Sequence, residues 1–219
     1  RREIWPLLRQ RWPALNKTLS RSAEHCREAT ELMQDMAKLD AKKVCIGNNH
    51  RLSLSALTAL PESRQRNVLR YAIEQARLPM PSTVVLQRII IETCTAAGDR
   101  MPLVTWPGAE VRRYRDQIHL DAAQTASVEL GESILQGTGD VSLADGRLLK
   151  WQLRSGEGLK QHVVRGKFLL RFREGGERIR LQGHSQHKSL KQLFQEWGVP
   201  PWQRQEIPLL FVDHELVAV

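Results

Sequence analysis

The stretch from Ser189 to Phe211, SLKQLFQEWGVPPWQRQEIPLLF, predicts a helix, a turn and a strand in that order. Four apolar residues follow the spacing that places side chains on one face of a helix: Leu190, Leu193, Phe194 and Trp197. Ser189 and Gln192 have the spacing of a capping box at the helix start. Gly198 can adopt the left-handed conformation that ends a helix, and the Pro200-Pro201 pair prevents its continuation. Residues 208–212 then predict a buried strand, so this segment should form a rigid platform.

The same segment resembles one protein family in its residue identities as well as in its helix-turn-strand pattern. Its Leu-Lys pair, LFQE helix, GVPPW sequence, Arg204 and Pro-Leu-Leu strand resemble the C-terminal domain of tRNA(Ile)-lysidine synthases. Three further stretches resemble the substrate-recognition domain of that family: ALPESRQRNVLRYAI (59–73), LPMPS (78–82) and VTWPGAEVRRYRDQIHL (104–120). The N-terminal RREIWPLL (1–8) resembles the segment that leads from the family's catalytic domain into its C-terminal part.

The resemblance implies an activity for a parent protein rather than for this chain alone. Lysidine synthases use ATP and Mg to activate the wobble cytidine in the CAU anticodon of tRNA(Ile), and they join lysine to it. Their SGGxDS phosphate-binding loop is absent here, since Ser155-Gly156-Glu157-Gly158 lacks the second adjacent glycine and the Asp-Ser. A P-loop lysine motif and a GxSxG motif are absent too. We therefore expect a fragment that starts within a helix, has no catalytic residues or cofactor, and holds the tRNA body, with its last domain towards the acceptor stem.

Composition limits the partner and the compartment. The 219 residues carry a net charge of +9, which favours a polyanionic partner, with nucleic acid ahead of membrane. The sequence contains no run of eighteen apolar residues and no signal-peptide pattern. Cys26, Cys45 and Cys94 lie far apart without a CxxC pair, which argues against structural zinc and a disulfide framework. A reduced cytoplasm fits this cysteine usage.

We expect an α+β protein with two domains, 1–122 and 123–219. The boundary follows from residues 121–146, which hold five acids, no Lys or Arg and several glycines. The first is predicted to be a mainly helical substrate-recognition domain with a small β hairpin, and the second a mixed tRNA-binding domain with antiparallel strands. An apolar seam over residues 15–36 predicts one long helix. We expect that helix to pack against neighbouring helices rather than to pair in a coiled-coil dimer.

The rest of the first domain carries clear start and stop signals. Residues 54–60 predict a short helix, and Pro61 begins a second helix that runs to about Arg77. The apolar stripe of this second helix consists of Val68, Leu69, Ala72 and Ala76. A third helix is predicted over 83–95. Three strands should follow, joined by short turns: 103–106, 109–114 and 117–120.

Two groups of arginines in this domain could contact RNA. The first lies on one side of the predicted second helix: Arg66, Arg70 and Arg77. The second surrounds Tyr114 on the predicted hairpin: Arg112, Arg113 and Arg115. Arginines suit a phosphate backbone, and a basic cluster interleaved with an aromatic residue is typical of RNA contacts. Solvated surface charge is the alternative interpretation of both groups.

Positive charge is concentrated between residues 147 and 191, which hold twelve Lys and Arg against three Glu. Within this region, 167–173 and 178–181 alternate around a turn at 174–177, which predicts a hairpin. If Phe172 and Ile179 face the core, four arginines share the outer face: Arg171, Arg173, Arg178 and Arg180. Like charges across strands repel, so an anionic ligand would relieve this face; water and salt could also screen it.

The candidate RNA-binding residues are therefore Arg66, Arg70, Arg112, Arg113, Arg115, Arg171, Arg173, Arg178, Arg180, Lys191, Trp202 and Arg204. Trp202 could stack on a base or pack on the helix end. One alternative function is a non-enzymatic protein-interaction module whose basic face meets an acidic partner. Another is a hydrolase that uses His184, His187 and His214. A metal site there would need three or four converging ligands, so we predict none, and the oligomeric state stays open.

Overall fold

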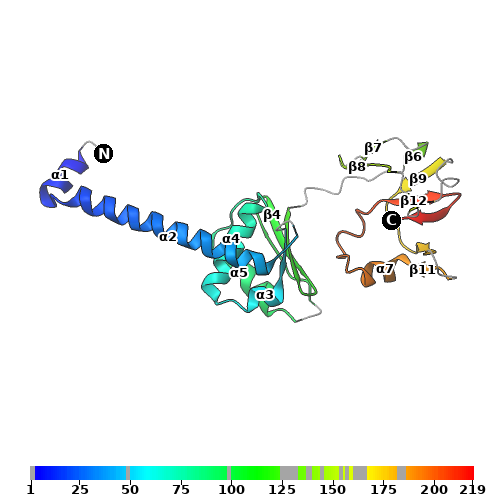
Figure 1. Cartoon of the computed structure of the whole chain (residues 1–219), viewed down its shortest axis with the longest axis horizontal. Coiled ribbons are helices and arrows are strands. Elements are labelled where there is room, and N and C mark those ends of the chain that lie inside the picture. Colours follow the sequence, from blue (N-terminus) through cyan, green and yellow to red (C-terminus); the bar gives the residue numbers. More distant parts are fainter. Residues whose placement is uncertain are drawn as a thin grey trace. The chain divides into compact units, whose positions relative to one another are not determined.

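The computed structural model describes residues 3–47, 50–97, 100–123, 133–136, 140–143, 146–152, 155, 158–159, 167–181 and 186–219. The chain forms two compact units, Arg1–Gln124 and Thr125–Val219, each with its own sheet (Figure 1). Both units combine helices with strands, so the predicted α+β class is confirmed. No helix in the described part of the chain is long and apolar enough to cross a membrane.

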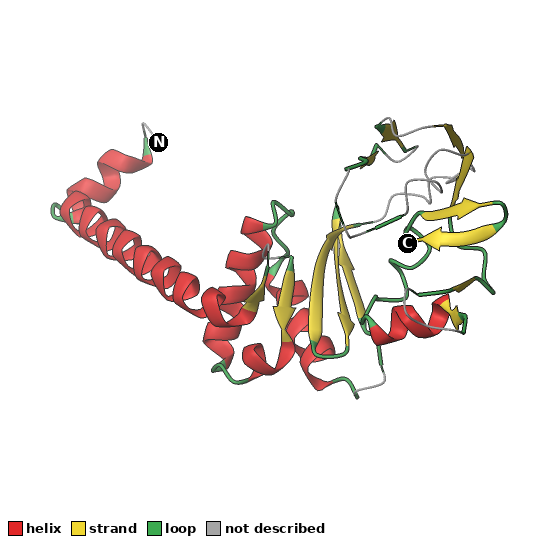
Figure 2. Cartoon of the chain, turned by 45° about the vertical axis from the view of Figure 1, so that its right-hand side comes forward, coloured by secondary structure: helices red, strands yellow, loops and turns green. Residues whose placement is uncertain are grey.

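The first unit combines a five-stranded antiparallel sheet with helices on one of its faces, while α1 (Ile4–Arg11) and most of α2 (Leu15–Val44) extend away from the sheet (Figure 2). Its other helices are α3 (Leu54–Thr58), α4 (Glu62–Gln75) and α5 (Thr83–Thr95). Its strands are β1 (Cys45–Ile46), β2 (Arg51–Ser53), β3 (Leu103–Trp106), β4 (Ala109–Tyr114) and β5 (Gln117–Ala122), in the order β1-β2-β5-β4-β3. The predicted hairpin is therefore part of a larger sheet, because β2 pairs with β5 over a long sequence separation.

The core of this unit lies between α4, α5 and the sheet. The predicted stripe of α4 is confirmed, since Val68, Leu69 and Ala72 are fully buried and pack with α5 and the inner side chains of the strands. Pro61 is the N-cap rather than the first helical residue, with ψ at 149°. The helix ends at Gln75, slightly before the predicted end, because Arg77 adopts a left-handed φ of 56°.

Helix α2 forms as predicted over 30 residues, but its apolar seam is mostly exposed. Its buried residues gather at the C-terminal end: Ala37, Asp40, Ala41 and Val44. Leu19, Met33 and Met36 are 40–52 % exposed. Most of the seam therefore does not pack against helices of the described chain, where only the last turns of α2 lie against α3 and α4 (Figure 1).

The second unit is built on a six-stranded mixed sheet. Its strands are β6 (Ser133–Gln136), β9 (Lys167–Arg171), β10 (Arg178–Ile179), β11 (Lys188–Ser189), β12 (Leu209–Val212) and β13 (Glu215–Ala218), in the order β11-β10-β13-β12-β9-β6. The β10–β13 pair is parallel and the other pairs are antiparallel. A separate ribbon pairs β7 (Val141–Ser142) with β8 (Leu148–Leu149). Helix α7 (Leu190–Glu196) packs its buried side chains against one face of the sheet.

The predicted hairpin between 167–173 and 178–181 is wrong. Strands β12 and β13 lie between β9 and β10, so the two segments are not neighbours in the sheet. The strand at 209–212 (LLFV) is more apolar than the segment at 178–181 (RIRL), and it takes the place beside β9. Strand β13 then pairs with β10. These long-range pairings bury Leu209 and Phe211 centrally, which a local hairpin would not have done.

The segment that predicted the platform folds largely as expected. Leu190, Leu193 and Phe194 are buried, and α7 ends where Gly198 takes a φ of +69°. The amide of Val199 donates to the Phe194 carbonyl at 2.8 Å, and that of Gly198 to Gln195 at 3.2 Å, which is a Schellman ending. Two details are wrong. Ser189 makes no side-chain capping bond, and Trp197 is 53 % exposed because it follows the last helical residue and meets Phe194 only edge-on.

Candidate nucleic-acid interface

Arg66 and Arg70, both on α4, differ in how accessible they are to a ligand. Arg70 lies exposed on α4. Arg66 is partly buried and donates to Glu62, one turn earlier, and to the Gln87 side chain at 3.3 Å. The hydrogen bond from Gln87 and the charge of Arg66 lower the pKa of Glu62, so the carboxylate stays ionised and holds Arg66. Arg77 is exposed but lies beyond the helix end.

The three hairpin arginines occupy three different environments. Arg113 is 8 % exposed, and its guanidinium donates to the carbonyls of Thr93 and Ala96 at 3.0 and 2.7 Å. Arg112 is half-buried and donates to Glu110 at 2.8 Å. Arg115 is exposed in the β4–β5 turn, where φ is +54° and its guanidinium lies 5.3 Å from the Tyr114 ring centroid. Of the three, only Arg115 has the exposure that a phosphate contact needs.

The turn that carries Arg115 is anchored to the helical layer. The amide of Ser55 and the hydroxyls of Ser53 and Ser55 donate to the Asp116 carboxylate, at 2.9 to 3.1 Å. Ser53 also caps α3 by accepting the amide of Ala56. The anchor fixes the position of Arg115 relative to α3, a feature that spacing within 109–120 could not reveal.

His119 is a buried polar residue that the sequence patterns did not single out. It is 3 % exposed and stands in register between Arg51 of β2 and Arg112 of β4. Burial, and then the charge of Arg51, lower the pKa of His119 to about 4. The imidazole is therefore neutral at physiological pH, so it adds no positive charge to this surface.

The four arginines predicted to share one outer face of the second unit do not do so. Arg171 lies across the Phe211 ring, 4.2 Å from its centroid, and donates to Glu174 at 3.1 Å. Arg173 turns instead towards Glu177, with 3.4 Å between its Nε and the carboxylate, and is partly buried. Arg178 and Arg180 are exposed on and beside β10. Three of the four, Arg171, Arg178 and Arg180, nevertheless line one hollow, because the sheet brings both segments to it.

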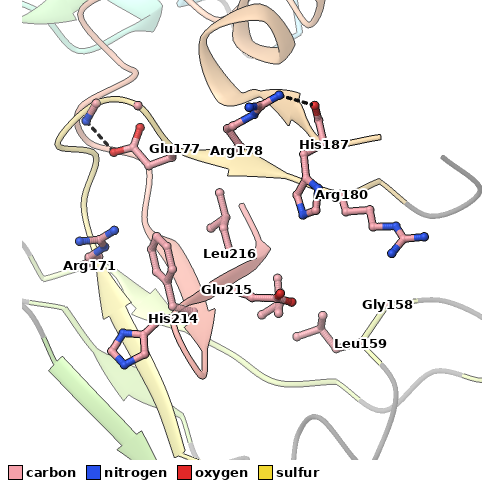
Figure 3. A pocket seen from close by; sticks show the side chains of 14 residues that line it. Gly158, Leu159, Arg171, Glu177, Arg178, Arg180, His187, His214, Glu215 and Leu216 are labelled. Atoms are coloured by element: carbon pink, nitrogen blue, oxygen red, sulfur yellow. Dashed lines mark hydrogen bonds between the residues drawn. The ribbon is translucent and has the colours of Figure 1, made fainter. Parts of the chain in front are cut away.

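This hollow has a volume of about 750 Å³ and receives residues from four strands (Figure 3). Its charged and titratable lining consists of Arg171, Glu177, Arg178, Arg180, His187, His214 and Glu215. His214 reaches it from the tight β12–β13 turn, where Asp213 and His214 both have positive φ, 46° and 67°. Arg178 and His187 also line a neighbouring hollow of about 470 Å³. The hollow is therefore the place where positive charge converges in the described part of this unit.

Glu177 organises the loop at the rim of the hollow, a role that the sequence did not indicate. Its Oε1 accepts the amides of Glu174 and Gly175 at 2.7 and 2.6 Å, and its backbone carbonyl accepts the amide of Leu190 at 2.9 Å. Burial alone would raise the pKa of Glu177, but hydrogen bonds from the loop amides and the charge of Arg173 outweigh burial and lower it. The carboxylate thus points into its own loop (Figure 3).

The remaining candidates lie around α7. Lys191 is exposed on the helix. Arg204 is 8 % exposed and donates to the Val199 carbonyl at 2.9 Å, so it stabilises the turn after the helix. Trp202 is half-buried in the same turn.

The histidines of the alternative hydrolase hypothesis are only partly placed. His187 and His214 line the same hollow, whereas His184 lies outside the described residues. Within the described ranges, no three His, Cys, Asp or Glu side chains converge on a position that could hold a metal ion. The sequence also lacks the SGGxDS phosphate-binding loop of the family that it resembles.

Comparisons with known proteins agree with this division into units. The family model described as the TilS substrate binding domain matches residues 52–119, and that of the TilS substrate C-terminal domain matches residues 168–219. Proteins named tRNA(Ile)-lysidine synthase from Coxiella burnetii, Legionella pneumophila (strain Lens) and Methylococcus capsulatus are 34 %, 32 % and 36 % identical.

Each alignment covers 100 % of this chain and 49–50 % of the relative, so the chain spans about half the length of the curated relatives it matches. The two matched regions lie one in each compact unit. On these grounds the chain belongs to the tRNA(Ile)-lysidine synthase family, with the family's substrate-binding domain in its first unit and the C-terminal domain in its second.

Proposed function

We propose that this chain is the tRNA-binding part of an ATP-dependent tRNA(Ile)-lysidine synthase. In this proposal it holds the tRNA body while a catalytic domain joins lysine to the wobble cytidine of the CAU anticodon. The observation that carries the proposal is the match of a substrate-binding and a C-terminal family domain, one in each unit. The net charge of +9 supports it, because a polyanion such as tRNA would be attracted to a chain with this charge.

Among the candidate RNA-binding residues, the exposed cations are the proposed phosphate contacts. They are Arg70, Arg115, Arg178, Arg180 and Lys191, with Arg171 at the edge of the hollow. Phosphate contacts fix orientation and supply affinity but read little sequence, so discrimination would come from which tRNA bodies fit both units. Arg113 and Arg204 are assigned a different role, because their guanidinium groups are buried against backbone carbonyls. Arg113 stabilises the β4–β5 turn that carries Arg115, and Arg204 stabilises the turn after α7.

No step of the ligation is assigned to residues of this chain. ATP and Mg would act in the catalytic domain of the family, where ATP activates the cytidine for attack by lysine. The contribution proposed for this chain is positional. Holding a substrate in the reactive geometry converts an encounter between molecules into a reaction within one complex.

Binding to tRNA(Ile) with a CAU anticodon tests the proposal. We expect steeply salt-dependent binding, and we expect Arg70→Gln and Arg115→Gln each to weaken it and to reduce the slope of log affinity against log salt by about one. Arg27→Gln is the matched control, since Arg27 is an exposed helical arginine outside both matched regions. Initiator methionine tRNA, which has the same anticodon, serves as the competitor.

Two results would contradict the proposal. If the chain fails to bind tRNA at low salt, it does not hold the substrate. If Arg27→Gln lowers the slope as much as Arg70→Gln does, the binding is a diffuse effect of net charge. Preference for the isoleucine tRNA over the methionine tRNA would place discrimination in these two units.

A further inference from the structure

The hollow of the second unit is large enough for a nucleotide and lined for one. Its volume of about 750 Å³ lies in the range of small-molecule sites. Arg171, Arg178, Arg180, His187 and His214 contribute its basic groups. A double helix keeps its bases paired and stacked inside, so it could offer this hollow only phosphates and groove edges. An unpaired nucleotide could enter with its base.

Arg171 provides a flat surface in the wall. Its guanidinium lies 4.2 Å from the centroid of the Phe211 ring, and Nη1 is held by Glu174 at 3.1 Å, so the plane is fixed from two sides. The side chain keeps 27 % exposure although its Nε is buried without a hydrogen-bond partner. A guanidinium that covers a ring on one side can stack a base on the other, which is a common mode of single-strand recognition.

Arg178 and His187 suit the phosphate of the same nucleotide. The Nη2 of Arg178 donates to the backbone carbonyl of His187 at 3.3 Å, which orients the guanidinium at the wall of the hollow (Figure 3). Arg178 is exposed, so its other N–H groups can reach a phosphate oxygen. The imidazole of His187 lines the same wall.

The negative charge of Glu215 favours a nucleotide over a bare phosphate as the ligand. Its exposed carboxylate lies in the hollow, in the midst of the basic residues (Figure 3). A site for phosphate alone would be weakened by this negative charge. A nucleotide also brings hydrogen-bond donors, namely the ribose hydroxyls and the exocyclic amines of its base, and a carboxylate accepts such donors well. The second carboxylate of the lining, Glu177, is already engaged, because two backbone amides donate to its Oε1 and the Arg173 guanidinium lies 3.4 Å from its Oε2.

We infer that this hollow binds one unpaired nucleotide of an RNA. The base stacks on Arg171, the phosphate meets Arg178 and His187, and Glu215 accepts hydrogen bonds from the ribose or the base. The inference deepens the proposed function and rests on it, since it assigns an unpaired part of the RNA substrate to a defined place in the second unit.

A comparison of single-stranded and duplex RNA with the full chain tests the inference. The probes are a short single-stranded oligoribonucleotide with a fluorescent label and the blunt duplex formed from the same sequence. Arg171→Lys keeps the charge but removes the plane, and Arg178→Gln removes the phosphate contact. Lys150→Gln is the matched control, because Lys150 is an exposed cation of the same unit outside the lining.

We expect the wild-type chain to prefer the single strand, and Arg171→Lys to reduce that affinity about tenfold with duplex binding unchanged. Arg178→Gln should weaken single-strand binding more than Lys150→Gln does. Equal affinity for strand and duplex, or a preference that survives Arg171→Lys, would overturn the inference. If wild-type binding to tRNA is intact in those cases, the proposed function stands; if tRNA binding is absent as well, both fail.

Discussion

Arg113 offers the sharpest test of how an arginine predicted to bind RNA acts in the folded protein. Its guanidinium is 8 % exposed and donates through Nη1 to the Thr93 and Ala96 carbonyls, and through Nε to the Arg115 carbonyl at 3.2 Å. Thr93 is the third-last residue of α5 and Ala96 its C-cap, so the charge also compensates the negative end of that helix. We predict that Arg113→Met destabilises the first unit without removing an RNA contact.

The hydrogen bonds set the size of the effect. Hydrogen bonds to charged groups contribute about 1.5–3 kcal/mol each, and a buried acceptor left unpaired loses its hydration as well. The two short bonds therefore account for roughly 3–6 kcal/mol, from which apolar packing of the methionine recovers part. We expect a loss of about 3 kcal/mol in the free energy of unfolding. The stability of Arg113→Lys should lie between those of the wild type and Arg113→Met, because a lysine ammonium can reach fewer of the carbonyls.

Denaturant titration of the first unit and tRNA binding measure the two consequences separately. The fluorescence of Trp106, which is 8 % exposed in the same core, reports unfolding. Arg115→Gln is the comparison variant, because Arg115 lies exposed in the next turn. We expect Arg113→Met to lose stability but to bind tRNA normally while folded. Arg115→Gln should keep the stability of the wild type and bind tRNA more weakly. A cost below about 1 kcal/mol, or a reduced salt slope for folded Arg113→Met, would refute the reasoning.

Two further predictions concern stability. His119 has a pKa of about 4 in the folded chain against 6.5 for the ordinary residue, so the unfolded state takes up its proton first as pH falls. The stability contribution of the neutral imidazole is thus complete above pH 6.5 and is lost towards pH 4, by roughly 3 kcal/mol relative to His119→Gln. If denaturant titrations at about pH 7 and pH 4 show the same difference in stability between the two proteins, this reasoning is contradicted. Gly198→Ala should lower the stability of the second unit by roughly 1 kcal/mol, because alanine is strained at a φ of +69°. Thermal unfolding measures this, with the exposed helical substitution Gln192→Ala as control, and equal melting temperatures for the two variants would show that the left-handed ending is not required.

The RNA contacts remain a prediction, but the structure shows the environment of each candidate residue. Sequence patterns found the basic residues, and the exposed positions of Arg70, Arg115 and Lys191 leave them available for RNA. They did not show that Arg113 turns inward, because the Thr93 and Ala96 carbonyls that it binds lie at the end of α5, which only the fold brings near. Arg204 turns inward to a nearby acceptor, the Val199 carbonyl in its own turn, and sequence patterns did not show this either. Clusters of like charge look the same in sequence whether the side chains are solvated or buried against backbone acceptors.

The hollow of the second unit was not predictable at all. Its walls come from β9, β10, β12 and β13, and the order of these strands depends on pairings between residues far apart in the chain. The local alternation around 174–177 favoured a hairpin, and nothing in that stretch indicates that β12 and β13 lie between its two arms. Arg171 and Arg178 line the same hollow because β12 and β13 pair with β9 and β10, not because their own segments form a hairpin.

The sequence by itself determined the elements whose signals are local. The helix α5 and the strands β3 and β4 have the predicted bounds, and α7 stops at Gly198, because periodicity, prolines and glycines act within a few residues. Tertiary structure alone decided the strand order, the burial of His119 and Arg113, and the exposure of the α2 seam. Those outcomes depend on which distant surfaces exclude water together, and the free energy of that exclusion belongs to the assembled fold rather than to any one segment.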